Sequence, residues 1–394
     1  MSLPGPQDLL AEARALGPRL SAWRRALHRR PELGLDCPEA AALVQKELLA
    51  LGLEVRTGLA RTGVAAVLRG GPGRAAALRV DLDALPLEER TGLPFASEIP
   101  GRMHACGHDG HTALGLGVAH LLASRAAQLG GDLLLLFQPG EEHPGGARPM
   151  IAEGALDDPS PAVILGCHLH PGLPLGRVAV CSGPATAGNE EFSITLTGQG
   201  GHAARPRDCR NPIPPAARLV LELEALAAGL AAGPSPAVLT VTQFQAGQGH
   251  NVIPRSVEIK GTLRFFQEEV RRAALADMAR ICRDLEAAEG VAVELSSVAD
   301  APPMVLPPDL AGRVRDCCAE LLGPGRVILP AETSMGAEDF AFFAQARPAS
   351  YLRLGCGDAA RNHGLHTPFF DFDEAVLPEA CAVLAWCLLR LLQG

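Results

Sequence analysis

The sequence predicts an α/β fold, a mixed, mostly parallel sheet flanked by helices, with an inserted α+β domain of ferredoxin-like type. In the first half of the chain, short apolar runs alternate with segments of helical length, a pattern typical of buried parallel strands joined by helices. From about residue 185 the strands instead alternate apolar and polar residues, which indicates a sheet with one solvated face. The chain has 394 residues, of which 47% are hydrophobic, and this is enough for two hydrophobic cores.

The first half supplies the elements of this sheet in order. Helical patterns cover residues 20–30, where Pro31 ends the helix, and residues 38–51. Apolar runs predict strands at residues 63–70, 75–83, 132–138 and 162–168, and an apolar stripe predicts a helix over residues 111–129. In such sheets the functional residues lie in loops at the carboxyl ends of the strands, so these loops are the expected place of a site.

A second series of helical and strand patterns predicts the inserted domain. The strand at residues 190–198 places Phe192, Ile194 and Leu196 on one face. After it come a helix, two strands, a helix and a strand, at residues 214–230, 237–247, 256–266, 268–288 and 290–298, which is the βαββαβ order of a ferredoxin-like unit. A strand at 349–356 and a helix from Pro378 to Leu392 then complete the first domain. We therefore expect one domain in two parts, residues 1–184 and 303–394, around an inserted domain of residues 185–302.

Composition argues against several classes of protein. Charged residues make up 20% of the chain, the formal net charge is -9 and no long run of Lys and Arg occurs, so we expect no nucleic-acid partner. No window approaches the ~18 apolar residues of a membrane span, and Asp8, Glu12 and two arginines stand where a signal peptide needs an apolar stretch. We therefore expect no membrane association and a cytoplasmic protein. The eleven scattered cysteines are expected to be reduced thiols.

Polar residues that could bind a metal or act in catalysis follow several of the strands. They are Asp81 and Asp83, the cluster RMHACGHDGH at residues 102–111, Glu141 and Glu142, His168 and His170, and, near the end of the chain, His363 and His366. If the strands lie side by side, these side chains meet at one edge of the sheet. A mixture of thiolate, imidazole and carboxylate suits zinc and its first-row neighbours better than magnesium or calcium.

Each of these groups also has an ordinary structural interpretation. Cys106 taken alone is more typical of a buried, unreactive thiol, and a single loop histidine is more often a surface or capping residue than a ligand. Adjacent glutamates usually lie on a solvated face, and we interpret Glu190 and Glu191 in this way. The two aspartates of RVDLDALP could end a strand or cap a helix. The placement of all these groups directly after strands favours a common site.

Ten motifs resemble one known family, in the family's order and along nearly the whole chain. They are LHRRPELG, RVDLDALP, MHACGHDGHTA, FQPGEE, GCHLHPGLPLG, GQGGHAARP, NVIP, GTLR, GAEDFAFF and LHTPFFDFDE. The family is the amidohydrolase and aminoacylase branch of the co-catalytic metallopeptidases related to carboxypeptidase G, which includes hippurate hydrolases and auxin-conjugate hydrolases. The resemblance implies a two-metal catalytic domain, here residues 1–184 and 303–394, with an inserted lid domain. One loop departs from the family pattern, because PELGLDCPEA lacks the Glu-Glu pair and the threonine that often follow PELG.

The resemblance also implies roles for individual residues of the catalytic domain. Two divalent ions, of zinc, manganese, cobalt or nickel, would be bound by Cys106, which both ions share, and by the terminal ligands His108, Glu142, His168 and His366. Glu141 is similar to the family's general base, which takes a proton from the attacking water and delivers it to the leaving amine. Asp81 belongs to a motif that is His-x-Asp in related peptidases and Arg79-Val80-Asp81 here. Asp81 would contact the ligands rather than the ions, and His108 would compensate for the missing imidazole. His143 and His170 lie beside assigned ligands and could displace one, but we expect them to stay outside the ligand set.

Three residues of the inserted domain resemble lid residues of the family. His202, in GQGGHAARP, is similar to the histidine that reaches the substrate carbonyl, often across a dimer interface, and stabilises the oxyanion. Asn251 and Arg264 resemble positions that bind the substrate carboxylate or line the cleft, and Arg264 is equally consistent with a solvated strand residue. The resemblance therefore also implies a homodimer.

These observations predict a metal-dependent hydrolase that cleaves the amide bond of an N-acyl amino acid or a peptide-like small molecule. Alternatives are a dipeptidase or carboxypeptidase of the same mechanism, an enzyme that uses Cys106 as nucleophile with His104 or His108 as base, and an inactive ligand-binding relative. No third group that would orient the base is evident for the thiol enzyme. The presence of all five ligands and Glu141 argues against an inactive relative.

Overall fold

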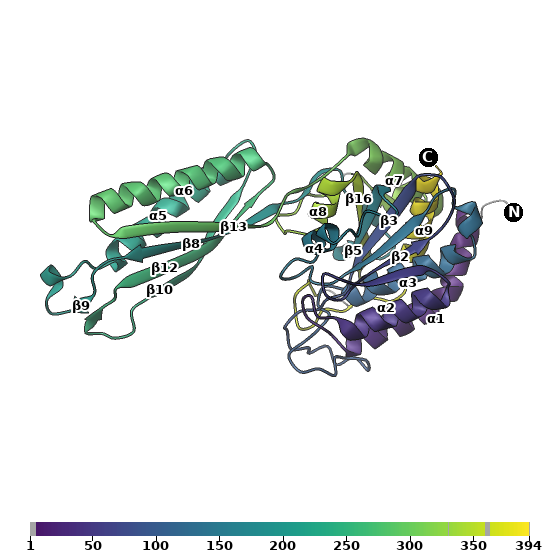
Figure 1. Cartoon of the computed structure of the whole chain (residues 1–394), viewed down its shortest axis with the longest axis horizontal. Coiled ribbons are helices and arrows are strands. Elements are labelled where there is room, and N and C mark those ends of the chain that lie inside the picture. Colours follow the sequence, from purple (N-terminus) through teal and green to yellow (C-terminus); the bar gives the residue numbers. More distant parts are fainter. Residues whose placement is uncertain (1–4, 330, 359–362, 394) are drawn as a thin grey trace. The chain divides into compact units, whose positions relative to one another are not determined.

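The computed structural model of this chain describes residues 5–329, 331–358 and 363–393 and divides them into two compact units (Figure 1). Unit 1 comprises the described residues of Met1–Ala185, Val305–Glu332 and Asp339–Gly394. Unit 2 comprises Thr186–Met304 and Thr333–Glu338. The segment 333–338, which the predicted bounds place in the catalytic domain, belongs with unit 2. That unit 2 serves as a lid stays a prediction.

Within the described residues, unit 1 is built on a mixed sheet of eight strands. In spatial order they are β1 (Glu54–Leu59), β2 (Gly63–Leu68), β4 (Leu133–Gln138), β3 (Ala75–Asp81), β5 (Pro161–Pro174), β16 (Ala349–Gly357), β6 (Val178–Val180) and β15 (Val327–Ile328). The central strands β4, β3, β5 and β16 are parallel, whereas antiparallel pairings join β1 to β2, β2 to β4 and β16 to β6. β2 and β4 are buried along their whole length, as their apolar sequences predict. The predicted mixed, mostly parallel sheet is confirmed.

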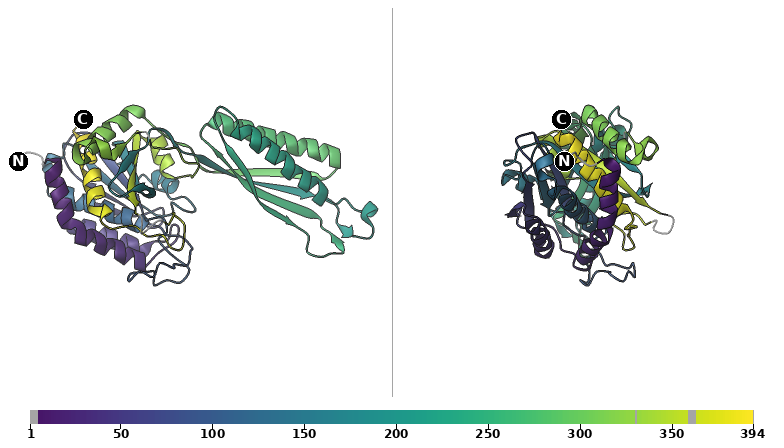
Figure 2. Two further views of the ribbon diagram at one scale, coloured as in Figure 1. Left: turned by 180° about the vertical axis from the view of Figure 1, so that it is seen from behind. Right: turned by 90° about the vertical axis from the view of Figure 1, so that its right-hand side faces the viewer.

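Helices surround this sheet (Figure 2). On one face α2 (Pro38–Ala50), α3 (His108–Ala123), α7 (Pro308–Leu322) and α9 (Val376–Leu392) contact the strands, and α1 (Pro6–Arg29) packs on α3 and α9. α8 (Phe340–Ala346) contacts β5 and β16, with α4 (Ala147–Ala152) beside it. These two helices lie on the opposite face, because Leu169 of β5 packs against α3 whereas Gly166, three residues earlier in the strand, packs against Phe340 of α8.

α1 is longer than the sequence predicted. The expected helix covered residues 20–30, whereas α1 begins at Pro6 and continues through Pro18. Proline inside a helix removes one hydrogen bond and is therefore usually confined to the first turn. Here a buried apolar face that includes Leu9 and Leu20 continues on both sides of Pro18, so that packing against α3 and α9 outweighs this loss.

Unit 2 has the predicted ferredoxin-like order. Its elements are β8 (Gly188–Thr197), α5 (Ile213–Ala231), β10 (Val238–Ala246), β12 (Ser256–Phe265), α6 (Glu268–Glu289) and β13 (Ala292–Ala301). The strands form an antiparallel sheet in the order β10-β12-β8-β13. Phe192, Ile194 and Leu196 form its core together with Leu219 of α5 and Met278 of α6. The alternation in the sequence of β8 therefore identified its buried face correctly.

Shorter elements complete the chain. β9 (Gly201–His202) pairs with β11 (Val252–Ile253) in unit 2. β7 (Gly183–Thr186) and β14 (Met304–Leu306) form a two-stranded sheet where the chain passes between the units. Short 3-10 helices lie at Ala126–Gln128, Pro206–Asp208 and Pro324–Arg326.

The prediction that Glu190 is solvated is wrong. Its side chain is 1% exposed, and Nε of Arg271 on α6 donates to its Oε2 over 2.7 Å. A carboxylate is tolerated in such a position when a guanidinium pairs with it. Glu191, which points to the other face of β8, is exposed as predicted.

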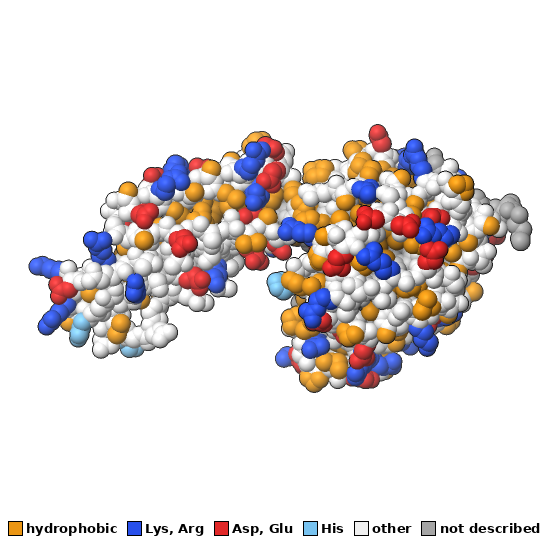
Figure 3. Space-filling view, viewed as in Figure 1, with side chains coloured by type: hydrophobic (Ala, Val, Ile, Leu, Met, Phe, Trp, Pro, Cys, Tyr) orange, Lys and Arg blue, Asp and Glu red, His pale blue; other side chains and the backbone are white. Residues whose placement is uncertain are grey.

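The surface of the molecule mixes both signs of charge. On the face drawn in Figure 3, acidic and basic side chains are interspersed over each unit. Among the helices of the described ranges, none is both long and apolar enough to cross a membrane.

Candidate metal centre

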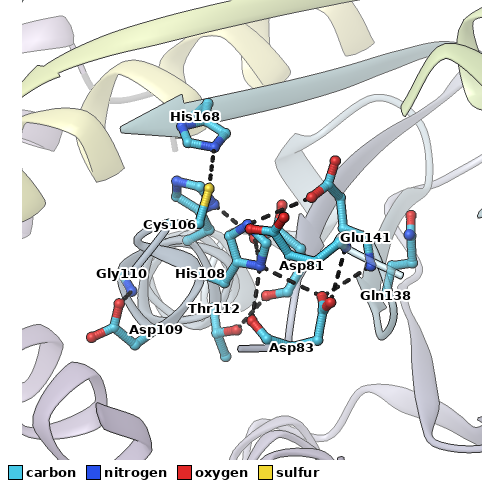
Figure 4. Close-up of polar contacts among 12 residues, drawn as sticks. Asp81, Asp83, Cys106, His108, Asp109, Gly110, Thr112, Gln138, Glu141 and His168 are labelled. Carbon is cyan, nitrogen blue, oxygen red and sulfur yellow. Dashed lines mark hydrogen bonds and ion pairs between the residues drawn. The ribbon is translucent and has the colours of Figure 1, made fainter. Parts of the chain in front are cut away.

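The predicted ligands of unit 1 come together at the carboxyl ends of its central strands (Figure 4). Cys106 lies in the loop before α3, His108 is the first residue of α3, and His168 lies on β5. Sγ of Cys106 is 3.3 Å from Nε2 of His168. The ligand atoms of Cys106, His108 and His168 all lie within 4.8 Å of one another, and so do those of Cys106, Glu142 and His366. Two groups of three residues thus share Cys106, which is the arrangement predicted for a thiolate between two ions.

Hydrogen bonds direct Nε2 of two histidines toward this cluster. Nδ1 of His108 is 2.9 Å from the backbone O of Asp83, and Nδ1 of His168 is 2.6 Å from the backbone O of Leu169. Because a carbonyl only accepts, Nδ1 carries a proton in each ring, which leaves Nε2 as the ring atom that can bind a metal. Nε2 of His108 is buried and has no hydrogen-bond partner among the described residues. A buried polar nitrogen without a partner is costly, and coordination to a divalent cation would satisfy it, so the residues present fit a metal.

Glu142 and His366 complete the second group. Oε1 of Glu142 is 3.0 Å from Nε2 of His366. His366 has a φ of 61°, a region that residues other than glycine seldom adopt, and its backbone N donates to the O of Ala105 over 2.8 Å. Backbone strain of this kind concentrates at functional sites. The bond to Ala105 ties the loop between β16 and α9 to the loop that carries Cys106.

Asp81 lies behind the ligands, in contact with His111. Nδ1 of His111 donates to Oδ1 of Asp81 over 2.7 Å, and Nε2 of the same ring accepts the N–H of Leu169 over 2.8 Å. Both ring nitrogens of His111 are therefore used, so His111 is not a ligand, although Asp81, His108 and His111 lie close enough together to hold an ion. Through His111, Asp81 instead fixes the backbone next to His168.

Arg79, which stands where the related peptidases have a histidine, is a structural cation. It is fully buried, and its Nη1 donates to Oδ2 of Asp81 over 2.9 Å. Its Nη2 donates to Asp339 over 2.7 Å and its Nε to Gln138 over 2.8 Å. A guanidinium has no acceptor and stays protonated, so Arg79 repels a metal ion rather than binding one. It holds Asp81 in place from behind.

Asp83 has a role that the sequence did not assign. Its Oδ1 accepts the backbone N–H of Glu141 and its Oδ2 that of Glu142, each over 3.0 Å. Its backbone O accepts the proton of His108 Nδ1. The signal that could have indicated this role is spacing, since Asp83 lies two residues after Asp81, the last residue of β3. Asp83 therefore positions the predicted general base and two predicted ligands together.

Electrostatics at the cluster favour a bound cation. Burial, together with the carboxylates of Glu142 and Glu141, holds the pKa of the Cys106 thiol well above its usual value. Burial, together with two neighbouring histidines, holds the pKa of His168 well below its usual value, so its imidazole is neutral. A thiol among carboxylates is a poor nucleophile by itself, whereas a metal ion stabilises the thiolate and makes it a ligand.

Other histidines near the ligands in sequence lie outside the ligand groups. Among the described residues, none of these groups includes His104, His143, His170 or His363. His143 and His363 are exposed, His170 is half-buried and His104 is buried. The assignment of His143 and His170 to positions outside the ligand set stays a prediction.

The predicted lid residues fall into two places within unit 2. His202 is exposed on β9, and its Nδ1 accepts the N–H of Ala204 over 3.1 Å. Asn251 is close to it, because the backbone O of Asn251 accepts the N–H of Ala203 over 3.0 Å. Arg264 lies near the far end of β12, opposite Asn189 of β8, and burial lowers its pKa. Within one unit 2, the structure therefore brings His202 and Asn251 together but not Arg264.

Comparisons with known proteins agree with this fold and this cluster. Residues 77–390 match the family model described as peptidase family M20/M25/M40. An N-acetyl-L-cysteine deacetylase from Bacillus subtilis is 37% identical over 380 residues, which cover 95% of this chain and 89% of that protein. An N-acyl-L-amino acid amidohydrolase from Geobacillus stearothermophilus is 40% identical over 275 residues, 69% of this chain and 74% of that protein. The crystal structure of a Bacillus subtilis protein described as a dinuclear metal binding peptidase of the M20 family has a TM-score of 0.83 and 33% identity, and covers 96% of this chain and 99% of that one.

Proposed function

This chain belongs to peptidase family M20/M25/M40, and from that premise we propose that it is a metal-dependent amidohydrolase that splits N-acyl amino acids into a carboxylic acid and a free amino acid. The relatives named above support this substrate class, because one is a deacetylase of N-acetyl-L-cysteine and another an N-acyl-L-amino acid amidohydrolase. The resemblance to the amidohydrolase branch that the motifs predicted is confirmed by these relatives.

One observation carries the proposal, the convergence of a thiol, three imidazoles and a carboxylate whose ligand atoms face one another. They come from Cys106, His108, His168, His366 and Glu142, and both three-residue groups meet at Cys106. Five ligands for two ions leave coordination positions open to water and substrate, as a catalytic site requires. Zinc, manganese, cobalt and nickel all suit this donor set, and we propose that the native metal is one of these four.

The general base is proposed to be Glu141. When bound, divalent ions polarise the amide carbonyl and lower the pKa of the attacking water. Oε2 of Glu141 is 3.9 Å from Nε2 of His108, its side chain is 10% exposed, and Asp83 holds its backbone N–H. Glu141 is therefore placed to take the proton of that water. When the C–N bond breaks, the same carboxyl delivers the proton to the nitrogen of the departing amino acid.

Residues of unit 2 are proposed to act on the substrate. We assign oxyanion stabilisation to His202, and binding of the substrate carboxylate to Asn251 and Arg264; the motifs GQGGHAARP, NVIP and GTLR support these roles. Because His202 lies in the two-stranded sheet of β9 and β11, which precedes β12, and Arg264 lies near the other end of β12, a single substrate would meet both residues most simply in a homodimer. Light scattering of the purified protein tests the dimer, and cell fractionation tests the expected cytoplasmic location.

The enzyme that uses Cys106 as nucleophile is disfavoured by the surroundings of the thiol. Burial opposes a free thiolate, and the carboxylates of Glu142 and Glu141 oppose it further. The deciding experiment is a panel of N-acyl amino acids and dipeptides, with release of the free amine measured before chelation, after chelation and after each metal is restored. We expect activity to disappear with the metal and to return with it. Activity that survives exhaustive chelation and is abolished by a thiol alkylator would instead identify the cysteine enzyme.

A further inference from the structure

A buried arginine outside the ligand set joins several carboxylates next to the metal centre. Arg24 of α1 is 1% exposed, and its Nε donates to Oδ2 of Asp109 over 3.1 Å. Its Nη2 donates to Asp371 over 2.6 Å and its Nη1 to Glu374 over 3.2 Å. Each arm of the guanidinium therefore has its own carboxylate partner. Such a planar, forked donor fixes both the distance and the orientation of the groups that it joins.

Two aromatic rings also pack against the guanidinium. Its central carbon lies 4.1 Å from the ring centroid of Phe372 and 4.8 Å from that of Phe95. Asp109 is fixed in turn, since its Oδ2 is 2.8 Å from Nδ1 of His28 and its Oδ1 accepts the N–H of Gly110 over 2.9 Å. The group of Arg24 and its carboxylates is therefore a rigid unit with few alternative arrangements.

The carboxylates around Arg24 belong to two of the segments that supply the proposed metal ligands. Asp109 directly follows His108, in the first turn of α3. Asp371 and Glu374 lie in the loop between β16 and α9, the loop that contains His366. Of the side chains around the guanidinium, Phe372 comes from that same loop. A single side chain of α1 thus connects the segment of Cys106 and His108 with the segment of His366.

We propose that Arg24 is a positioning residue for the metal centre, which sets the separation between the loop of Cys106 and His108 and the loop of His366. The proposal rests on the function given above, because it assumes that these residues bind metal. Removal of Arg24 leaves Asp109 with His28 and the N–H of Gly110 as partners, and it removes the guanidinium that links Asp109 to Asp371 and Glu374. Two ions that share one thiolate require both loops at fixed positions. The loss of Arg24 should therefore lower metal affinity even in a protein that stays folded.

The test measures metal affinity and the spectrum of the cobalt-loaded protein for Arg24→Met, at a temperature at which every variant is folded. We expect affinity for the metal pair to fall roughly 10- to 100-fold, the thiolate-to-cobalt charge-transfer band to weaken, and kcat to fall more than KM rises. The matched control is Arg25→Met, because Arg25 is the next residue of α1 and pairs with the same Glu374, but its side chain is exposed. Arg25→Met should change neither the affinity nor the band.

A second control separates positioning from stability. Leu20 is fully buried one turn earlier in α1, and Leu20→Ala should lower the melting temperature without a change in metal affinity. Affinity of Arg24→Met within twofold of wild type would overturn the proposal. If Arg24→Met does not fold, the double variant Asp371→Asn, Glu374→Gln weakens both ion pairs of Arg24 with the second loop, and an unchanged affinity in that variant overturns the proposal equally. A wild-type protein that binds no metal would instead contradict the proposed function itself. This result is distinct from an unchanged affinity in the variants.

Discussion

The ring of His111 donates to the carboxylate of Asp81 over 2.7 Å, and the same ring accepts the N–H of Leu169, the neighbour of His168. Asp81 is therefore linked to a predicted ligand without touching the metal. We expect Asp81→Asn to lower kcat and metal affinity by roughly 10- to 100-fold, because the amide weakens the bond that orients His111. Steady-state kinetics and elemental analysis check this expectation. Unchanged values for both would show that Asp81 serves only the packing of β3.

Glu141 and Glu142 are adjacent, but the proposed functions of their side chains differ. Glu141→Gln should keep both metal ions and lose at least ~100-fold in turnover, because the amide cannot take the proton of the attacking water. Glu142→Gln should instead lose metal, since Oε1 of Glu142 faces Nε2 of His366. Metal content and turnover of the two variants, measured side by side, separate the roles. A Glu141→Gln enzyme with near wild-type turnover would refute the assignment of the base.

Replacement of Cys106 should affect the metal pair rather than the fold. Cys106 is 6% exposed, and its Sγ is the one ligand atom common to both three-residue groups. Cys106→Ser should weaken binding of the metal pair and abolish the thiolate-to-cobalt band, whereas Cys106→Asp, which supplies a carboxylate, should retain metal and shift the preference toward manganese. Elemental analysis after dialysis against mixed metals measures both effects. Full zinc occupancy in Cys106→Ser would argue against a bridging thiolate.

Stability should depend on pH through His28. Burial opposes the charged ring, but hydrogen bonds to Asp109 and Glu89 raise the pKa of His28 to about 9, compared with ~6.5 in an unfolded chain. The folded protein thus holds this proton more tightly, so the stabilisation is fully present below pH ~6.5 and is lost as the pH rises through about 9. Melting temperatures of wild type and His28→Gln should differ most near pH ~6 and converge toward pH ~10. A difference that grows with pH would contradict a protonated His28.

Arg271 should stabilise unit 2 far more than its neighbour Arg272. Arg271→Met leaves the carboxylate of Glu190 buried without its partner, which should cost about 3 kcal/mol of unfolding free energy. Arg272 pairs with the exposed Glu269, so Arg272→Met should cost less than about 0.5 kcal/mol. Hydrogen exchange of the amides in β8 and α6 reports the local stability of both variants. Equal protection in the two would indicate that Glu190 finds another donor.

The parts of the molecule that the sequence predicted are those set by local patterns. The apolar run of β4 and the alternation in β8 fix which residues are buried, and these patterns need no knowledge of distant partners. The five predicted ligands follow strands or lie in motifs of fixed spacing, and the topology alone brings the ends of β3, β4 and β5 together.

The residues that the sequence missed depend on contacts between distant segments. Glu190 was misjudged because its partner Arg271 lies 81 residues away, on a helix whose exposed face gives no sign of the pair. Arg24 was overlooked because an arginine in an amphipathic helix is ordinarily solvated, and its partner Asp371 lies 347 residues further along the chain. Such pairs cannot be found from the spacing of residues within one element.

The order of the strands has a consequence for how the protein is made. β16 lies between β5 and β6, so the sheet of unit 1 keeps an open gap while the ribosome produces residues 186–304. Unit 2 can therefore complete its own core on the nascent chain while β5 still presents an unpaired edge, a state that favours aggregation. His366, the last of the five proposed ligands to be synthesised, follows even β16 along the chain. Metal loading is thus expected to follow translation, as the final step in maturation of the enzyme.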